Sequence, residues 1–215
     1  MFRDNLTVYL ADDHTVVRKG MLRLLKTFQR VKAVQDAANG KELLALIEIA
    51  PPDAVILDLE MPVMGGVEAA RLITTQYQEV KILILTMHTE AVFIHKLMDI
   101  GIHGFLSKSS GPDEVERALY SIIDKDFYKN EIVENAMRKS ASMASIETTS
   151  KLSTRELEIL LLICQELTPA EISERLQISE KTFFNHRTKI LMKTRSRSNV
   201  GLFRFAVQRG YIELK

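Results

Sequence analysis

The sequence predicts an α/β domain with a doubly wound parallel sheet, followed by a small all-α domain. Residues 1–125 alternate short apolar runs with longer amphipathic runs five times, whereas all the signals after Lys151 are helical. The charge changes at the same place. Residues 151–215 carry 12 Lys and Arg against 7 Asp and Glu, a net charge of +5, and residues 1–150 carry 17 against 21, a net charge of −4. Two parts of opposite charge indicate two tasks on one chain.

Five βα units are expected in the first part. A run of branched apolar residues is typical of a strand buried on both faces, and apolar residues at helical spacing predict the helices between them. Pro51-Pro52 and Gly101 end two of these helices, and Pro112 suits the first turn of another. The strands are expected at 6–12, 31–37, 54–58, 81–87 and 104–108, and the helices at 15–28, 40–50, 66–76, 90–100 and 112–123.

A linker is expected over residues 126–150, which separates domains at 1–125 and 151–215. Residues 130–139 are compatible with one short helix, but residues 140–150 hold six Ser and Thr and no aromatic residue. Such a composition is typical of a flexible connection.

Four helices are predicted in the second part, at about 154–165, 169–176, 180–194 and 198–208. Ser153 and Thr168 each precede a Glu by three residues, which is a capping-box pattern. Only the three residues Gln-Ile-Ser separate the second helix from the third, and the third is basic. Two short helices joined by a tight turn fit a helix-turn-helix.

The cysteine count and the N-terminal sequence restrict the class of protein. Cys164 is the only cysteine, which excludes an internal disulfide and a cysteine-rich zinc site. The N-terminal residues show no signal-peptide pattern, and no apolar run reaches membrane-spanning length. We therefore expect a cytoplasmic protein that does not insert in a membrane.

Polar residues follow the predicted strands where each one ends. Asp58 alone has a simple alternative explanation, because a strand-ending Asp often caps the next turn. However, Asp12-Asp13, Thr86 and Lys108 occupy the equivalent positions of three other strands. The carboxyl ends of parallel strands share one edge of the sheet, and ligands bind there. Three neighbouring carboxylates require a cation, and carboxylate oxygens suit Mg²⁺. Asp58 is then a plausible nucleophile that forms an aspartyl phosphate.

Four motifs carry a resemblance to a known family. The stretches YLADDHTVVRKG, DAVILDLEMPVMGG, ILILTMH and GFLSKSS resemble the receiver domain of two-component response regulators. The stretch from Leu152 to Thr194 resembles the LuxR-type helix-turn-helix, and together the two halves resemble the NarL/FixJ family. The resemblance implies a flavodoxin-like fold with strand order 2-1-3-4-5, and a regulator that is not an enzyme beyond its own phosphoryl transfer and dephosphorylation.

The same resemblance implies a role for each matching residue. Asp58 would be the phosphoacceptor for a sensor histidine kinase. Asp13, Asp58 and the backbone carbonyl of Glu60 would bind Mg²⁺, with Asp12 acting largely through water. Thr86 and Lys108 would hold the phosphoryl oxygens, and Thr86 and Phe105 would form the switch. Met87 departs from the family, which usually has a small residue there.

The third helix of the second part is expected to bind double-stranded DNA. Residues 180–197 carry six basic residues against one acid, which is typical of a phosphate-facing surface, although a merely solvated basic face is the simpler alternative. Phe183 should face the core and Phe184 should be exposed, where many relatives have a lysine. The expected DNA-binding residues are Lys181, Phe184, Asn185, Arg187, Thr188, Lys189 and Lys193.

The function predicted from these features is phosphorylation-controlled transcription regulation, with a homodimer formed by the phosphorylated chain. Two alternatives remain at this stage. One is a receiver that acts mainly through protein contacts, with an output domain that binds DNA weakly, which Phe184 supports. The other is an aspartyl-phosphate hydrolase, which would need a substrate pocket and a positioned acid or base.

Overall fold

The computed structural model describes residues 4–87, 91–135 and 152–213. These fall into two compact units. One comprises Met1–Thr89 with Ile102–Tyr128, and the other comprises Glu90–Gly101 with Lys129–Lys215. None of the described helices has the length and apolar character that crossing a membrane requires.

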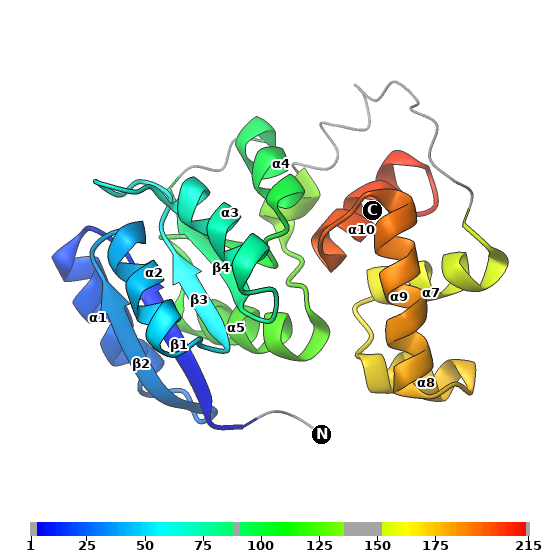
Figure 1. Cartoon of the computed structure of the whole chain (residues 1–215), viewed down its shortest axis with the longest axis horizontal. Coiled ribbons are helices and arrows are strands. Elements are labelled where there is room, and N and C mark those ends of the chain that lie inside the picture. Colours follow the sequence, from blue (N-terminus) through cyan, green and yellow to red (C-terminus); the bar gives the residue numbers. More distant parts are fainter. Residues whose placement is uncertain (1–3, 88–90, 136–151, 214–215) are drawn as a thin grey trace. The chain divides into compact units, whose positions relative to one another are not determined.

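The first unit contains a five-stranded parallel sheet with the order β2-β1-β3-β4-β5, so the predicted topology is confirmed. Figure 1 shows helices on both faces of this sheet. The strands are β1 (Leu6–Ala11), β2 (Val31–Ala37), β3 (Ala54–Leu57), β4 (Lys81–Thr86) and β5 (Gly104–Ser107).

The helices of the α/β part alternate with the strands as the sequence predicts. They are α1 (Thr15–Leu25), α2 (Gly40–Ile49), α3 (Gly66–Gln76), α4 (Ala91–Ile100) and α5 (Pro112–Lys125). Figure 1 shows α2 and α3 on one face of the sheet and α1 and α5 on the other. Most ends differ from the sequence-based expectation by three residues or fewer, because fraying ends are poorly marked by hydrophobic periodicity.

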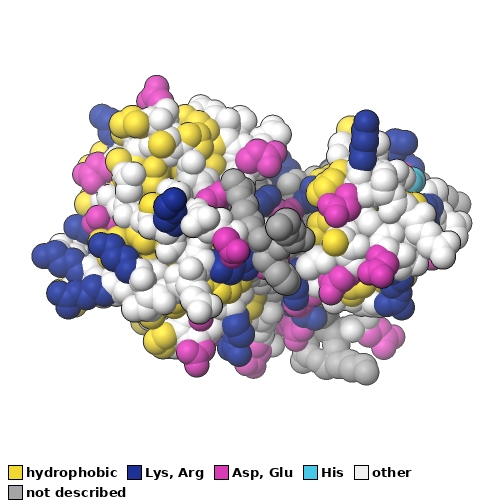
Figure 2. All heavy atoms as spheres, turned by 90° about the horizontal axis from the view of Figure 1, so that it is seen from below, with side chains coloured by type: hydrophobic (Ala, Val, Ile, Leu, Met, Phe, Trp, Pro, Cys, Tyr) yellow, Lys and Arg dark blue, Asp and Glu magenta, His cyan; other side chains and the backbone are white. Residues whose placement is uncertain are grey.

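The core of the first unit explains why β1, β3 and β4 are so apolar. Leu10, Ile56 and Leu83 are fully buried on the face that α1 and α5 cover. The strands are covered on both faces, so they read as continuous apolar runs rather than as alternating ones. β2 is different: it lies at the sheet edge, and of its seven residues four are exposed, two are partly buried and one, Ala37, is buried. On the face that Figure 2 shows, Lys and Arg side chains gather on the side of the first unit that carries α1 and β2.

The second unit contains the four predicted helices of the output part, α7 (Thr154–Cys164), α8 (Pro169–Leu176), α9 (Glu180–Thr194) and α10 (Asn199–Gln208). Both predicted capping boxes are present, at Ser153 with Glu156 and at Thr168 with Glu171. Gln177 takes a left-handed conformation (φ 52°) that ends α8, and Ser179 caps α9 by accepting a hydrogen bond from the Thr182 N–H. The tight turn of a helix-turn-helix is therefore built from three residues.

The expected linker is described only in part. Residues 131–135 are helical, which agrees with the short helix expected there. The Ser- and Thr-rich segment 140–150 lies outside the described residues.

Candidate functional site

The acidic site lies where β1 and β3 end at the carboxyl edge of the sheet. The backbone N–H of Asp58 donates to the Ala11 carbonyl at 2.8 Å, so the pairing of β1 and β3 continues for one residue beyond the strand. Oδ1 of Asp58 accepts a 2.8 Å hydrogen bond from the Leu59 N–H. The Asp58 residue is 3% exposed and Asp12 is fully buried. Two carboxylates at this depth require cationic neighbours.

Gly66 explains why the chain carries a glycine pair after Asp58. A Cβ atom at Gly66 would lie 2.0 Å from the Asp58 carbonyl oxygen, and the Gly66 N–H donates to the Leu59 carbonyl at 3.0 Å. The first turn of α3 is therefore in direct contact with the backbone that carries Asp58. Only glycine allows this approach, so the sequence that ends β3 also fixes the position of the carboxylate.

Lys108 is the cation that links the two buried carboxylates. Its Nζ lies 2.7 Å from Oδ2 of Asp58 and 2.8 Å from Oδ2 of Asp12. The sheet positions this side chain, because the Lys108 N–H donates to the Thr86 carbonyl at 3.0 Å. The prediction that residues at three strand ends come together is therefore met for Asp12, Asp58 and Lys108.

Burial and charge have opposite effects on these groups. Burial raises the pKa of Asp58, and the hydrogen bond from Lys108 opposes this rise without cancelling it. Burial by itself would lower the pKa of Lys108, but its hydrogen bonds to Asp12 and Asp58 outweigh that effect and raise the pKa. Lys108 therefore stays charged, and one ammonium group does not fully compensate the two carboxylates.

Four side chains at this edge offer a set of metal ligands. One donor atom from each of Asp12, Asp13, His14 and Asp58 lies within 4.8 Å of the others. Oδ2 of Asp12 and Oδ1 of Asp13 are buried atoms, and each has one close nitrogen neighbour. Lys108 Nζ lies 2.8 Å from Oδ2 of Asp12, and His14 Nδ1 lies 2.7 Å from Oδ1 of Asp13. Carboxylate oxygens clustered in this way fit a divalent cation.

Sequence reasoning missed Arg18, which supports the Asp12-Asp13 turn. Its Nη1 donates to the carbonyl of Asp12 at 2.7 Å and to that of Asp13 at 3.3 Å, while its Nε donates to Oδ2 of Asp36 at 2.9 Å. Arg18 thereby holds the backbone of both acidic residues against β2. The available signal was spacing, because Arg18 lies one helical turn after His14 at the start of α1.

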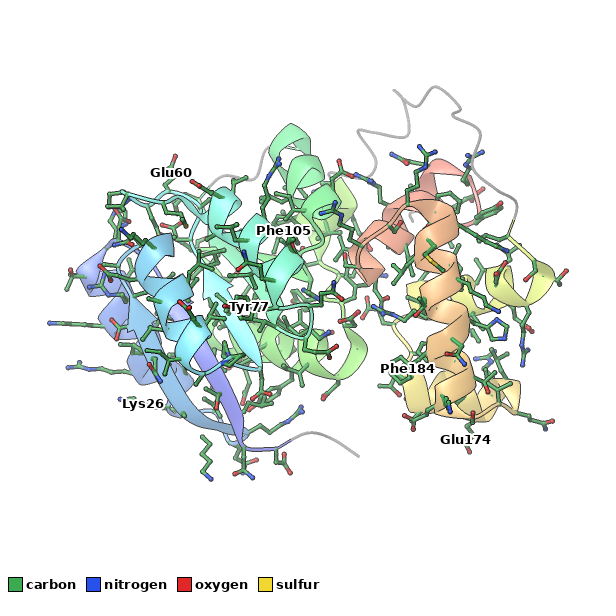
Figure 3. All side chains as sticks on the ribbon, viewed as in Figure 1. Lys26, Glu60, Tyr77, Phe105, Glu174 and Phe184 are labelled. Carbon is green, nitrogen blue, oxygen red and sulfur yellow. The ribbon has the colours of Figure 1, made fainter. Side chains whose placement is uncertain are left out.

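The remaining predicted residues lie at or beside the same edge. Thr86 ends β4 and is 3% exposed, and Phe105 on β5 is 1% exposed. Glu60 lies on the exposed loop that follows Asp58 (Figure 3). The structure places these residues where the sequence predicts them, while their roles in phosphoryl transfer stay predictions.

A second candidate site is the exposed face of α9. Lys181, Phe184, Asn185 and Thr188 follow the spacing i, i+3, i+4 and i+7, so they share one side of the helix. All four are exposed, and so is Lys189. Phe183, in contrast, is 2% exposed and Phe184 is 47% exposed, as predicted (Figure 3). The two rings meet edge to face with their centroids 5.2 Å apart.

Two of the predicted DNA-binding residues are engaged within their own unit. Nε of Arg187 donates to Oδ1 of Asn199 at 3.0 Å. Nζ of Lys193 donates to Oε2 of Glu156 at 2.6 Å, and Glu156 is 4% exposed. The sequence identified Glu156 only as a capping residue. Its second contact joins residues 37 positions apart, which no local pattern predicts.

The family models match both halves of the chain. The response regulator receiver domain matches residues 8–120, and the bacterial regulatory proteins of the luxR family match residues 150–206. The chain is 34% identical to the response regulator UvrY of Escherichia coli strain K12 and 30% identical to the response regulator GacA of Pseudomonas aeruginosa. The alignment covers 95% of both chains for UvrY, and 97% of this chain and 98% of the relative for GacA.

A solved structure supports the same assignment. A two-component response regulator of the LuxR family from Aurantimonas sp. SI85-9A1 is 32% identical, with a TM-score of 0.59 over 63% of this chain and 98% of that chain. Response regulators of this family are transcription factors rather than enzymes, so the hydrolase alternative falls away. The chain therefore belongs to the NarL/FixJ family of two-component response regulators, with a receiver domain and a LuxR-type DNA-binding output domain.

Proposed function

We propose that Asp58 accepts a phosphoryl group from a sensor histidine kinase and that this modification controls the binding of the output domain to double-stranded DNA. The observation that carries the proposal is the Lys108 ammonium group between Asp58 and Asp12, at 2.7 Å and 2.8 Å. Asp12 shares the strand-end position, the deep burial and the contact with this cation, so the choice of Asp58 as the acceptor is supported by the match of residues 8–120 to the receiver domain.

The transfer itself is a substitution at phosphorus. A carboxylate oxygen of Asp58 attacks the phosphorus of a phosphohistidine, the P–N bond breaks, and the imidazole leaves with the electron pair. Lys108 and the Thr86 hydroxyl then bind oxygens of the transferred group. Thr86 and the buried Phe105 are the elements that we propose respond to the phosphoryl group.

Mg²⁺ is the cofactor that this donor set fits best. Asp13 and Asp58 would bind it directly, the Glu60 carbonyl would complete the protein ligands, and Asp12 would act through water. The bound cation would supply positive charge to the phosphoryl oxygens. Arg18 holds the backbone carbonyls of Asp12 and Asp13, which keeps both carboxylates at the site before the cation binds.

On DNA, we propose that α9 enters the major groove with its exposed face. Lys181 and Lys189 suit phosphates, and Phe184, Asn185 and Thr188 suit base edges. Arg187 and Lys193 lie beside this face, and their contacts with Asn199 and Glu156 orient them for phosphates at its margin. Two-fold pairing of phosphorylated chains would match two half-sites on DNA.

The proposed domains are a receiver at 1–125, a linker at 126–150 and an output domain at 151–215. A chain that meets both a kinase's phosphorylated domain and DNA would act in the cytoplasm. If two phosphorylated chains pair through α10, the contact has to use the exposed side of this helix, because Leu202 and Phe203 are already buried.

Labelling with acetyl phosphate tests the phosphoacceptor. In the presence of Mg²⁺ the chain should gain one phosphoryl group, located by peptide mass spectrometry on the segment that contains Asp58. Asp58→Asn should gain none. Full labelling of that variant would assign the phosphoryl group to another residue.

A mobility-shift assay against a pool of genomic fragments tests the output. Binding of the phosphorylated chain to particular fragments supports sequence-specific DNA recognition. If it binds none of them, the output domain works through protein contacts instead.

A further inference from the structure

His14 stands at the rim of the acidic site and its role in that site is unassigned. It directly follows the two acidic residues that come after β1, and it precedes the first residue of α1. Its backbone N–H donates to Oδ1 of Asp12 at 2.8 Å, which anchors the residue independently of its ring. Its side chain is 64% exposed, so the ring is not held by packing.

The imidazole nevertheless points at the acids rather than away from them. Nδ1 lies 2.7 Å from Oδ1 of Asp13 and 3.4 Å from Oδ1 of Asp12. Nδ1 also belongs to the group of four donor atoms that lie within 4.8 Å of one another. Among the residues that the structure describes, this is the one cluster of His, Cys, Asp and Glu with metal-ligand spacing.

A nitrogen donor changes which cations such a site prefers. Carboxylate oxygens and water suit Mg²⁺, whereas imidazole suits Zn²⁺, Ni²⁺ and the other late first-row ions. The carboxylate oxygens of Asp12, Asp13 and Asp58 lie within 4.8 Å of one another and of the His14 donor atom, which is the spacing of ligands around one ion. Because the His14 side chain is 64% exposed, its ring has room to turn from its carboxylate neighbour toward a bound metal ion.

We propose that His14 is a specificity-determining ligand: it adds a nitrogen donor to the carboxylates of the receiver, so that late first-row divalent ions such as Ni²⁺ and Co²⁺ compete with Mg²⁺ at this site. The proposal rests on the proposed function, because the same carboxylates would hold Mg²⁺. Oxygen sites also bind Ni²⁺ more tightly than Mg²⁺. The diagnostic quantity is therefore the change in the Ni²⁺-to-Mg²⁺ affinity ratio when His14 is removed.

Isothermal titration calorimetry of the full chain with NiCl₂ and with MgCl₂ measures this ratio. His14→Ala should weaken Ni²⁺ binding by about tenfold or more and Mg²⁺ binding by less than about twofold. The wild-type Co²⁺ complex should also show a visible absorption spectrum that changes in His14→Ala. His186→Ala is the matched control, because it removes a histidine of the second unit, and it should retain the wild-type ratio and spectrum.

Each alternative result has a distinct meaning. An unchanged Ni²⁺ affinity in His14→Ala, or equal losses for Ni²⁺ and Mg²⁺, would overturn the ligand role of His14 and leave the phosphoacceptor assignment intact. An Asp58→Asn variant that binds Mg²⁺ as tightly as the wild-type chain would instead contradict the proposed function, and the His14 proposal with it.

Discussion

The ammonium group of Lys108 lies 2.7 Å from the Asp58 carboxylate and 2.8 Å from that of Asp12, so one cation joins two buried acids from different strands. The contact has two consequences. It keeps a charge available for an incoming phosphoryl group, and it occupies the carboxylates that a divalent cation would bind.

Lys108→Ala should slow phosphorylation by acetyl phosphate about a hundredfold, which is the usual cost of removing one preorganised donor. The same change should tighten Mg²⁺ binding, because Asp12 and Asp58 lose their internal counter-charge. Lys108→Arg keeps the charge and should show intermediate rates. The rates come from mass spectrometry over time and the affinities from calorimetry. A variant that labels at the wild-type rate would exclude Lys108 from the transfer.

Gly66→Ala should destabilise the chain by about 2 kcal/mol or more, because its Cβ would lie 2.0 Å from the Asp58 carbonyl oxygen and the backbone must move. Labelling at Asp58 should fall as well. Gly20→Ala is the matched control: a Cβ there meets nothing within 4 Å, and alanine in the middle of α1 should stabilise by about 0.5–1 kcal/mol. Urea unfolding measures the stability of both variants. Equal stability of the two variants would show that α3 is not held against Asp58.

Glu156 should make the output part sensitive to acid. Burial opposes ionisation of Glu156, but hydrogen bonds from Lys193 and Ser153 prevail and lower its pKa to about 2. A carboxyl group whose pKa is lower in the folded state stabilises the fold at pH values above its ordinary pKa of 4.5, and this contribution is lost as the pH falls toward 2.

Glu156→Gln should therefore lower the free energy of unfolding at pH 7 by about 2 kcal/mol, and the difference from the wild type should shrink between pH 4.5 and pH 2. Glu171→Gln, in the exposed capping box of α8, should lower the free energy of unfolding by less. Urea unfolding across this pH range makes the comparison. If the stability difference between Glu156→Gln and the wild type is constant with pH, the contact between Glu156 and Lys193 stabilises the fold through packing and not through charge.

Phe184→Ala should reduce sequence discrimination more than overall affinity. An exposed phenyl ring on the same face as Asn185 suits a thymine methyl group in the major groove, and Asn185 then suits an adenine edge. The expected loss is about 1–3 kcal/mol of discrimination between A·T-containing half-sites and their mutated forms. Sites selected from a random DNA library and measured by fluorescence anisotropy provide the readout.

Lys181→Ala is the comparison for Phe184→Ala. Loss of a phosphate contact should weaken binding to all DNA sequences alike and should lower the salt dependence of binding by about one ion. Tighter DNA binding by unphosphorylated Phe184→Ala would instead indicate that the ring covers the helix in the resting state. No change in either affinity or preference would remove Phe184 from DNA recognition.

Hydrophobic periodicity and strand-end polar residues were sufficient to predict the parallel sheet, both helix sets and the meeting of Asp12, Asp58 and Lys108, whereas the strand order came from the resemblance to the receiver family. These features follow from local pattern, since the carboxyl ends of parallel strands must share an edge. The opposite burial of Phe183 and Phe184 was predictable for the same reason, because neighbours on a helix point about 100° apart.

Contacts that join distant positions were not predictable in this way. The Lys193 bond to Glu156 depends on how α7 packs on α9, and the support of Asp12 by Arg18 depends on a side chain reaching backbone carbonyls. The glycine pair after Asp58 was visible in the sequence, but the close approach of Gly66 to the Asp58 carbonyl oxygen appears only in three dimensions.

The central claim is that the state of Asp58 controls DNA binding, and DNA affinity with and without beryllofluoride, a phosphoryl mimic, tests it most directly. Fluorescence anisotropy on a selected DNA site should show that beryllofluoride with Mg²⁺ tightens binding by the wild-type chain about tenfold, a typical coupling between two sites. Asp58→Asn should bind equally with and without the mimic. Equal affinity of the wild-type chain under both conditions, or the same increase in Asp58→Asn, would contradict the account.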